Sequence, residues 1–186
     1  MGCVFCASGM NGVARNLTVG EIVEELVRLR NLTLPDERLT HIVVMGMGEP
    51  LANLDNLLEA LEIAGDKSGL GIGARHVTIS TVGLPVKIRR LADLGKQYHL
   101  AVSLHAPNDD LRTRIVPTNK QTGMHAILDA AHYFSDHTGR QVTYESLVLL
   151  RLPDSPRQAL PLSPLLPCPH SPFPLIPFHS LSPLPY

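Results

Sequence analysis

The sequence predicts an α/β fold with a parallel sheet, because segments typical of strands alternate with segments typical of helices. Four short apolar runs indicate buried strands, at residues 41–46, 76–80, 99–104 and 142–150. Helical patterns of about 10–15 residues separate them, which is the spacing of βαβ units. Four strands are too few for a complete eight-stranded barrel. We therefore expect an incomplete barrel or an open, doubly wound sheet.

The predicted helices follow from their caps and their apolar spacing. Thr18 and Glu21 form a capping box; the helix after it has apolar positions at Ile22, Val23, Leu26, Val27 and Leu29. The next helix carries leucines at helical spacing, at positions 54, 57, 58 and 61. A third helix is predicted over 86–94, with Pro85 at its start, and a fourth over 124–137.

Prolines divide the chain into two regions. Residues 1–150 contain 5 of the 16 prolines, and residues 151–186 contain the other 11. Proline has no backbone N–H, so the second region cannot keep a regular ladder of hydrogen bonds. We expect a folded core in residues 1–150 and an irregular, Pro/Leu-rich segment in residues 151–186.

Composition narrows the class of protein. The net charge of −1 neither indicates nor excludes a nucleic-acid partner, because a basic groove can exist within a balanced total. The three cysteines (Cys3, Cys6 and Cys168) do not fit a disulfide framework and suit a reducing compartment. No signal peptide and no apolar run of bilayer length are found. A cytoplasmic protein without a membrane partner is expected.

Polar clusters follow three of the predicted strands, at residues 46–49, 80–83 and 103–105. In both candidate architectures, ligands bind at the carboxyl ends of the strands. Each cluster also has a simpler interpretation. Glu49 would face solvent from a tight turn, Ser80 and Ser103 would bond local backbone, and a lone His105 is most often structural. Four arginines are expected on the surface: Arg89, Arg90, Arg112 and Arg114. Of these, Arg112 and Arg114 could touch phosphate.

The pair Cys3 and Cys6 has the spacing of a metal or cluster site, with Phe5 between the thiols as a shield from water. Zinc would need two more ligands at matched spacing, and a thioredoxin-like pair should follow a strand. An iron–sulfur site normally has more than two thiolates. On spacing alone, a cluster is plausible but short of ligands.

Taken together, these segments resemble the RlmN/Cfr family of radical S-adenosylmethionine RNA methyltransferases, most closely the RlmN type. The most specific segments are Met45-Gly46-Met47-Gly48-Glu49-Pro50 and Ser103-Leu104-His105-Ala106-Pro107-Asn108. Further matches, in the family's order, are residues 2–9, 15–18, 80–83, 115–117 and 119–120. The resemblance runs from residue 2 to about residue 150.

The resemblance implies a partial (β/α) barrel of the radical SAM type. It implies a 4Fe-4S cluster held by three thiolates, of which Cys3 and Cys6 match the second and third. The remaining iron binds S-adenosylmethionine. Gly48 and Glu49 match the pair that holds the methionine part of this cofactor. Ser80, Ser103, Leu104 and His105 match further cofactor contacts.

The family's activity is methylation of carbon 2 of an adenine in 23S rRNA, and often in tRNA. The resemblance therefore implies RNA and an external electron donor as partners of a monomeric enzyme. The Cfr type, which modifies carbon 8 of the same adenine, is the rival within the family. A non-catalytic RNA- or metal-binding remnant is a rival of another class. A radical enzyme acting on a small molecule is disfavoured by the segment 103–108.

The sequence also departs from the family pattern. The first cluster cysteine would lie two residues before Met1, and the cysteine that carries the methyl group would lie beyond Tyr186, so no catalytic cysteine is assigned and the chain is expected to be inactive alone. Residues 175–178 resemble a strand of the family, and His179 stands where the family has a cofactor-binding asparagine. The region 151–186 thus resembles a degraded continuation of the core, whose prolines would break the helix expected at 155–166.

Overall fold

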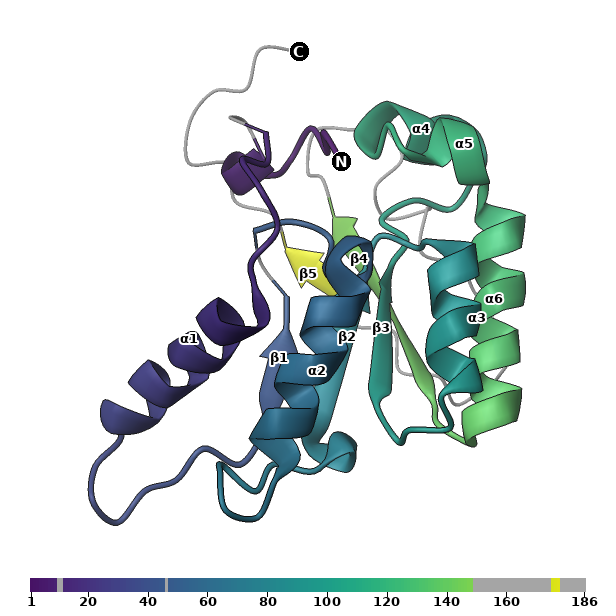
Figure 1. Ribbon diagram of the computed structural model, residues 1–186. Helices are drawn as coiled ribbons and strands as arrows, with labels where there is room; N and C mark the ends of the chain where they lie inside the picture. Colours follow the sequence, from purple (N-terminus) through teal and green to yellow (C-terminus); the bar gives the residue numbers. More distant parts are fainter. Residues whose placement is uncertain (10–11, 46, 149–174, 178–186) are drawn as a thin grey trace.

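A computed structural model describes residues 1–9, 12–45, 47–148 and 175–177 (Figure 1). Five parallel strands form one sheet: β1 (Ile42–Val44), β2 (Val77–Thr81), β3 (His99–Ser103), β4 (Val142–Val148) and β5 (Leu175–Pro177). The α-helices are α1 (Val19–Asn31), α2 (Leu54–Gly65), α3 (Pro85–Asp93), α4 (Asp109–Ile115), α5 (Asn119–Thr122) and α6 (Met124–Thr138). Three short 3-10 helices complete the description: η1 (Ala7–Gly9), η2 (Pro50–Asn53) and η3 (Ala74–His76).

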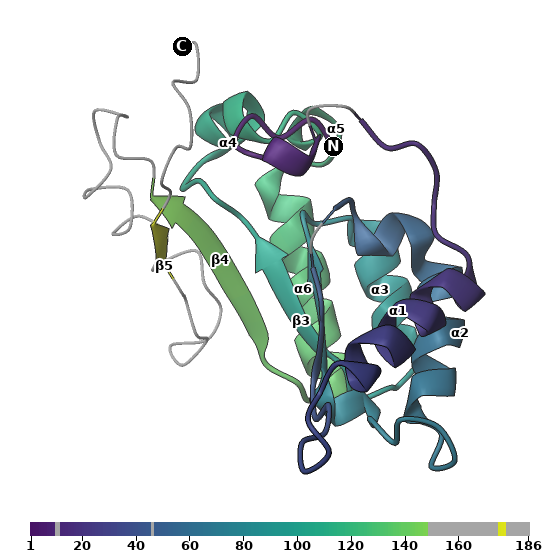
Figure 2. The same cartoon turned by 90° about the vertical axis from the view of Figure 1, so that its left-hand side faces the viewer.

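The strand order decides between the two architectures. The strands lie side by side in sequential order, from β1 to β5. Figure 2 shows α2, α3 and α6 on the same side of this sheet. A doubly wound sheet would reverse its strand order and place helices on both faces. The fold is therefore the incomplete (β/α) barrel, and the doubly wound alternative is wrong.

The two faces of the sheet differ in chemistry, because successive side chains of a strand point to opposite faces. On the face covered by helices lie buried apolar residues such as Ile79, Leu100, Val102 and Tyr144. The other face, which we call the open face, carries Thr78, Ser80, Ala101, Ser103, Thr143 and Glu145. The register places Ser80 beside Ala101, and Ser103 beside Glu145. Apart from Val43 and His99, which the register also assigns to it, the open face is thus mostly small and polar.

Close packing between the end of β2 and α6 explains why residue 83 is a glycine. Gly83 follows β2 with φ +99°, a conformation that side chains rarely adopt. A Cβ atom added there would lie 2.7 Å from Cγ2 of Ile127 in α6. Pro85 begins α3 as predicted, and α3 and α6 pack together beside this turn. Glycine at this position therefore lets the end of β2 approach α6.

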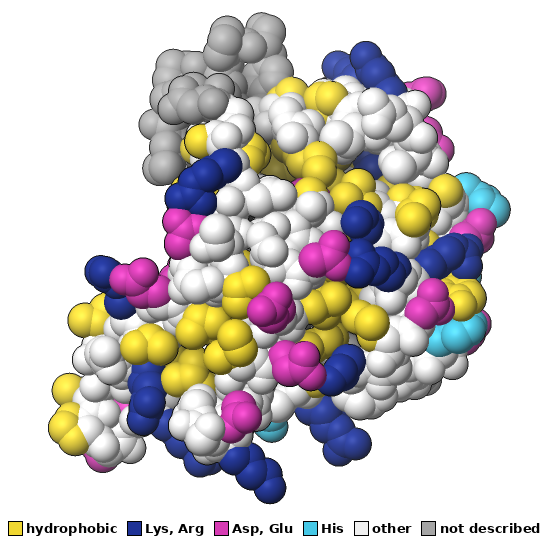
Figure 3. Space-filling view, in the orientation of Figure 1, with side chains coloured by type: hydrophobic (Ala, Val, Ile, Leu, Met, Phe, Trp, Pro, Cys, Tyr) yellow, Lys and Arg dark blue, Asp and Glu magenta, His cyan; other side chains and the backbone are white. Residues whose placement is uncertain are grey.

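Helix α1 begins as predicted but is less buried than its pattern suggests. The capping box is present, since Thr18 and Glu21 each accept a hydrogen bond from the other's backbone N–H. None of the α1 side chains is buried, and Val27 and Leu29 are 40% and 48% exposed. Hydrophobic side chains are accordingly visible on the surface in the region of α1 (Figure 3). None of the described helices combines the length and apolar character that a bilayer crossing requires.

The proline-rich region contributes one described element. Strand β5 pairs in parallel with β4, with Leu175 opposite Ser146. A strand at this place agrees with the resemblance of residues 175–178 to a family strand. The predicted disruption of a helix at 155–166, and His179, lie outside the described residues. The expectation that most of 151–186 is irregular stays a prediction.

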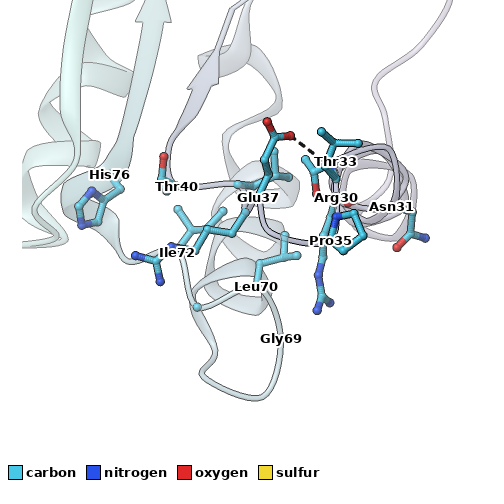
Figure 4. A pocket seen from close by; sticks show the side chains of 14 residues that line it. Arg30, Asn31, Thr33, Pro35, Glu37, Thr40, Gly69, Leu70, Ile72 and His76 are labelled. Carbon is cyan, nitrogen blue, oxygen red and sulfur yellow. Dashed lines mark hydrogen bonds between the residues drawn. The ribbon is translucent and has the colours of Figure 1, made fainter.

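A pocket of the described residues lies away from the predicted site. It has a volume of about 630 Å³ and is lined by the segment after α1 and by the loop before β2. Figure 4 shows Glu37 and Ile72 among its lining residues. His76, which immediately precedes β2, marks this as the amino-terminal end of the sheet. The predicted site residues lie at the other end.

Candidate functional site

The three predicted clusters do meet at the carboxyl ends of β1, β2 and β3. In Figure 1 the N-terminal segment and α4 lie at this same end of the sheet. Glu49 from the turn after β1 bonds to Thr81 and Val82 at the end of β2. Ser103 at the end of β3 bonds to Glu145 in β4. The parallel topology thus brings together residues that are distant in sequence.

Glu49 is buried, so its interpretation as a solvent-facing turn residue is wrong. Its Oε1 accepts from Leu51 N (3.0 Å) and Thr81 Oγ1 (2.7 Å), and its Oε2 accepts from Val82 N (2.8 Å). Burial raises the pKa of Glu49, and the three hydrogen bonds act in the opposite direction. A carboxylate offers about four acceptor positions. Among the described residues, one acceptor position on Oε2 therefore has no donor and could accept from an amine or a hydroxyl.

Gly48, immediately before it, has φ +142°, a conformation that favours glycine. Apart from the two residues next to it in the chain, no described residue has a heavy atom within 4 Å of the position of a Cβ at Gly48. The preceding Gly46 lies outside the described residues. The backbone at Gly48 is therefore open to the close approach of a ligand on the described side of the turn.

The turn after β3 is held by Glu145. Leu104 N and His105 N both donate to the backbone carbonyl of Glu145, at 3.0 and 3.1 Å. Ser103 Oγ donates to Glu145 Oε2 at 3.1 Å. Ser80 lies on the open face of the neighbouring strand and is 9% exposed. The two predicted serines thus share one face, and the local-backbone interpretation is wrong for the Ser103 hydroxyl.

His105 has a strained backbone conformation and is buried, and one of its ring nitrogens lacks a hydrogen-bond partner among the described residues. It has φ +61°, which is uncommon for residues other than glycine. Its ring packs edge-to-face on Phe5, with 4.8 Å between ring centroids. Burial, with the positive charge of Arg112, lowers the pKa of His105 to about 4, so the ring is neutral at pH 7. Its Nδ1 atom has no hydrogen-bond partner among the described residues. A buried polar atom of this kind fits a site that a ligand completes.

The two cysteines lie on one turn, docked beside this cluster. Cys6 N donates to Cys3 O at 3.1 Å, and Val4 N donates to Ile115 O at 3.0 Å. Cys3 and Phe5 pack against the small apolar cluster of Ala106, Ile115 and Val116. Burial, and then the charge of Cys6, raise the pKa of the Cys3 thiol. Both cysteines are free thiols.

The thiols fit two of the three positions of an iron–sulfur cluster motif. They are partly buried, unpaired in any disulfide and separated by two residues, as thiolate ligands of one cluster often are. The described residues contain no group of three or more His, Cys, Asp or Glu that could hold a metal ion. The described part of the chain therefore supplies a partial ligand set.

Arg112 is the site residue that sequence reasoning missed. Its surface interpretation is wrong, because the residue is 1% exposed. Its Nε donates to Leu104 O (3.0 Å), its Nη1 to Asn119 Oδ1 (2.6 Å), and its Nη2 to Ser103 O (3.1 Å) and Val82 O. Burial lowers the pKa of Arg112 to about 10. The guanidinium thus joins the ends of β2 and β3.

A signal for Arg112 does exist in the sequence. Asn108 caps α4 by accepting from Leu111 N at 2.9 Å, so the helix begins at Asp109. Leu111, Arg112 and Ile115 then fall on one helical face, and the two apolar residues identify it as the inward face. By contrast, Arg90 pairs with Asp55 on the surface, as its predicted solvated position requires.

Comparisons with known proteins agree with this geometry. The family model described as the radical SAM superfamily matches residues 1–160. A curated protein of Rhodopirellula baltica named probable dual-specificity RNA methyltransferase RlmN is 50% identical over 186 residues, which is 100% of this chain and 50% of that protein. A protein of the same name from Spiroplasma citri is 45% identical over 89% of this chain and 48% of its own length. The chain spans about half the length of the curated relatives it matches.

Solved structures give the same fold. A radical SAM methyltransferase from Sphaerobacter thermophilus is 40% identical and superposes with a TM-score of 0.84, over 95% of this chain and 51% of that one. Streptococcus suis SuiB bound to S-adenosylmethionine is 20% identical, with a TM-score of 0.62 over 98% of this chain and 39% of that one, and shows the fold alone. The chain belongs to the radical SAM superfamily, and within it the chain is similar to RNA methyltransferases of the RlmN type.

Proposed function

We propose that this chain is the core of an RNA methyltransferase that methylates carbon 2 of an adenine in 23S rRNA and in tRNA. The observation that carries the proposal is the 50% identity to a protein named as an RlmN RNA methyltransferase, which extends over all 186 residues. The two relatives described above both carry the RlmN name. This favours carbon 2 over the carbon 8 specificity of the Cfr type.

The superfamily uses a 4Fe-4S cluster and S-adenosylmethionine. When bound, these groups supply one-electron chemistry, with the electron coming from an external donor. In the proposal, Cys3 and Cys6 hold two of the irons. The protein's own contribution is to bind the cofactor, to orient it and to exclude water.

The remaining site residues would bind S-adenosylmethionine. Gly48 leaves room for its methionine part, and the free acceptor position of Glu49 Oε2 suits its ammonium group. Ser80, Ser103, Leu104 and His105 lie at the neighbouring strand ends, where the adenosyl part would extend. The neutral His105 ring can donate or accept at Nδ1, according to its tautomer.

The test is a nucleoside analysis of RNA modified by the protein at the full length of its gene. The protein is incubated anaerobically, with a reductant and S-adenosylmethionine, on 23S rRNA and tRNA from a strain that lacks the modification. We expect 2-methyladenosine by mass spectrometry, and none from the matched variant with Cys3→Ser and Cys6→Ser. The appearance of 8-methyladenosine would instead assign the Cfr type. Unmodified RNA, from a protein that carries its cluster, would refute the proposed function.

A further inference from the structure

The open face carries one acidic residue in an unexpected place. Among the residues of β1 to β4, Glu145 is the only carboxylate, and it lies in the middle of β4, opposite the last residue of β3. Its side chain is partly buried beside Ser103, its partner in the register. It makes no ion pair with any residue in the described part of the chain. With one hydrogen bond and no cation among the described residues, this partly buried carboxylate has most of its charge uncompensated there.

The backbone of Glu145 has a structural role, whereas its side-chain carboxylate is largely unused as an acceptor. Its backbone carbonyl accepts from Leu104 N and His105 N, and these bonds do not depend on the side chain. Its carboxylate accepts one bond, from Ser103 Oγ at 3.1 Å. Most of its acceptor positions therefore remain unused by the described residues.

The bond to Ser103 also determines what the serine can offer. A serine hydroxyl has one proton and two lone pairs. Because the Ser103 proton points to Glu145, the lone pairs of Ser103 are left for a ligand. Glu145 and Ser103 together present two adjacent acceptors, which match a ligand with two adjacent donors. The two hydroxyl groups of a ribose are such donors, and carboxylates bind ribose hydroxyls in other nucleotide sites.

We propose that Glu145 binds the ribose of S-adenosylmethionine by accepting a hydrogen bond from one hydroxyl, with Ser103 accepting from the other. This inference rests on the proposed function, since it assumes that the site takes this cofactor. It adds Glu145 to the cofactor-binding residues. It also explains why a lone carboxylate stands among small side chains on the open face.

The test is a binding cycle on the full-length protein that combines protein and ligand changes. Affinity is measured by calorimetry for S-adenosylmethionine and for its analogues that lack the 2′- or the 3′-hydroxyl. Glu145→Ala should weaken binding of S-adenosylmethionine about 10- to 100-fold, the range for a hydrogen bond to a charged group. Glu145→Gln keeps one acceptor oxygen and should lose less. Glu59→Ala, at an exposed position of α2, is the matched control and should bind normally.

The cycle distinguishes a ribose contact from a structural role. If Glu145 contacts the ribose, one of the two deoxy analogues binds the Glu145→Ala variant as tightly as S-adenosylmethionine binds that same variant. The missing hydroxyl then costs nothing, because the carboxylate that would accept its hydrogen bond is already absent. If the loss of binding free energy from Glu145→Ala and the loss from removing a hydroxyl simply add for both analogues, the proposed ribose contact is wrong and the proposed function stands. If the unaltered protein does not bind S-adenosylmethionine at all, both proposals fail.

Discussion

Replacement of Arg112 by methionine should be the most destabilising single change at the strand ends. Methionine keeps much of the volume but none of the donors. The substitution leaves three backbone carbonyls (Val82, Ser103 and Leu104) and Asn119 Oδ1 without their buried donor. A buried polar group that loses its partner costs about 1–3 kcal/mol. Because the four acceptors relax together, we expect a total of about 3–5 kcal/mol.

This loss is large beside the total stability of a domain, which is about 5–15 kcal/mol. At roughly 2–4 °C per kcal/mol for a chain of this size, the melting temperature should fall by roughly 6–20 °C. Urea unfolding followed by circular dichroism measures the free energy directly. Arg112→Lys should recover only a small part, because one ammonium group cannot reach carbonyls at the ends of both β2 and β3.

The matched control lies on the same helix. Arg114 is exposed, so Arg114→Met should change stability by less than about 0.5 kcal/mol. The reasoning is refuted if Arg112→Met and Arg114→Met unfold at the same urea concentration. A change in the slope of the transition, rather than in its midpoint, would point instead to an altered unfolded state.

Three further predictions concern stability. Folding lowers the pKa of His105 from 6.5 to about 4, so the unfolded state takes up the proton first as the pH falls. The free energy of unfolding should therefore decline between pH 6.5 and pH 4 by up to about 3 kcal/mol. The variant His105→Asn also tolerates a positive φ, and its unfolding free energy, measured as a function of pH, should lack this decline. Gly83→Ala should cost about 2–4 kcal/mol by chemical denaturation, because the new Cβ would overlap Ile127, whereas Gly71→Ala, which also has a positive φ (+68°) but open space for the Cβ, should cost about 1 kcal/mol; equal costs would contradict the packing argument. Thr18→Ala should remove the cap of α1 at a cost of about 1 kcal/mol, and Thr18→Ser should retain it; no difference in thermal unfolding would argue against the capping box.

The elements that could be predicted from the sequence are those long enough to show a clear apolar pattern. The strands at 76–80 and 99–104 match β2 and β3 to within one residue at either end, because parallel strands buried under helices are nearly continuous apolar runs. Helices α4 and α5 were not predicted, since seven and four residues are too few to show a helical period. The interior position of Arg112 was missed with them.

Other features depend on packing partners that a pattern does not name. The apolar spacing of α1 correctly indicated a helix, but it could not show that Val27 and Leu29 would stay exposed. The spacing of Glu49 and Thr81 in the sequence does not reveal their hydrogen bond, which follows from the neighbouring positions of β1 and β2. Pro177 is compatible with β5 because this strand pairs, in the described residues, with β4 alone.

The docking of the cysteine turn on α4 sets an order of assembly. Val4 finds its acceptor at Ile115, and Cys3 rests on residues near Ala106, so this platform is made later than the thiols themselves during synthesis. Closing so long a loop is entropically costly until β3 and α4 have formed. Cys3 and Cys6 are thus synthesised before the residues on which they come to rest. The contacts that partly bury Cys3 in the folded chain are therefore absent until α4 and the turn after β3 exist.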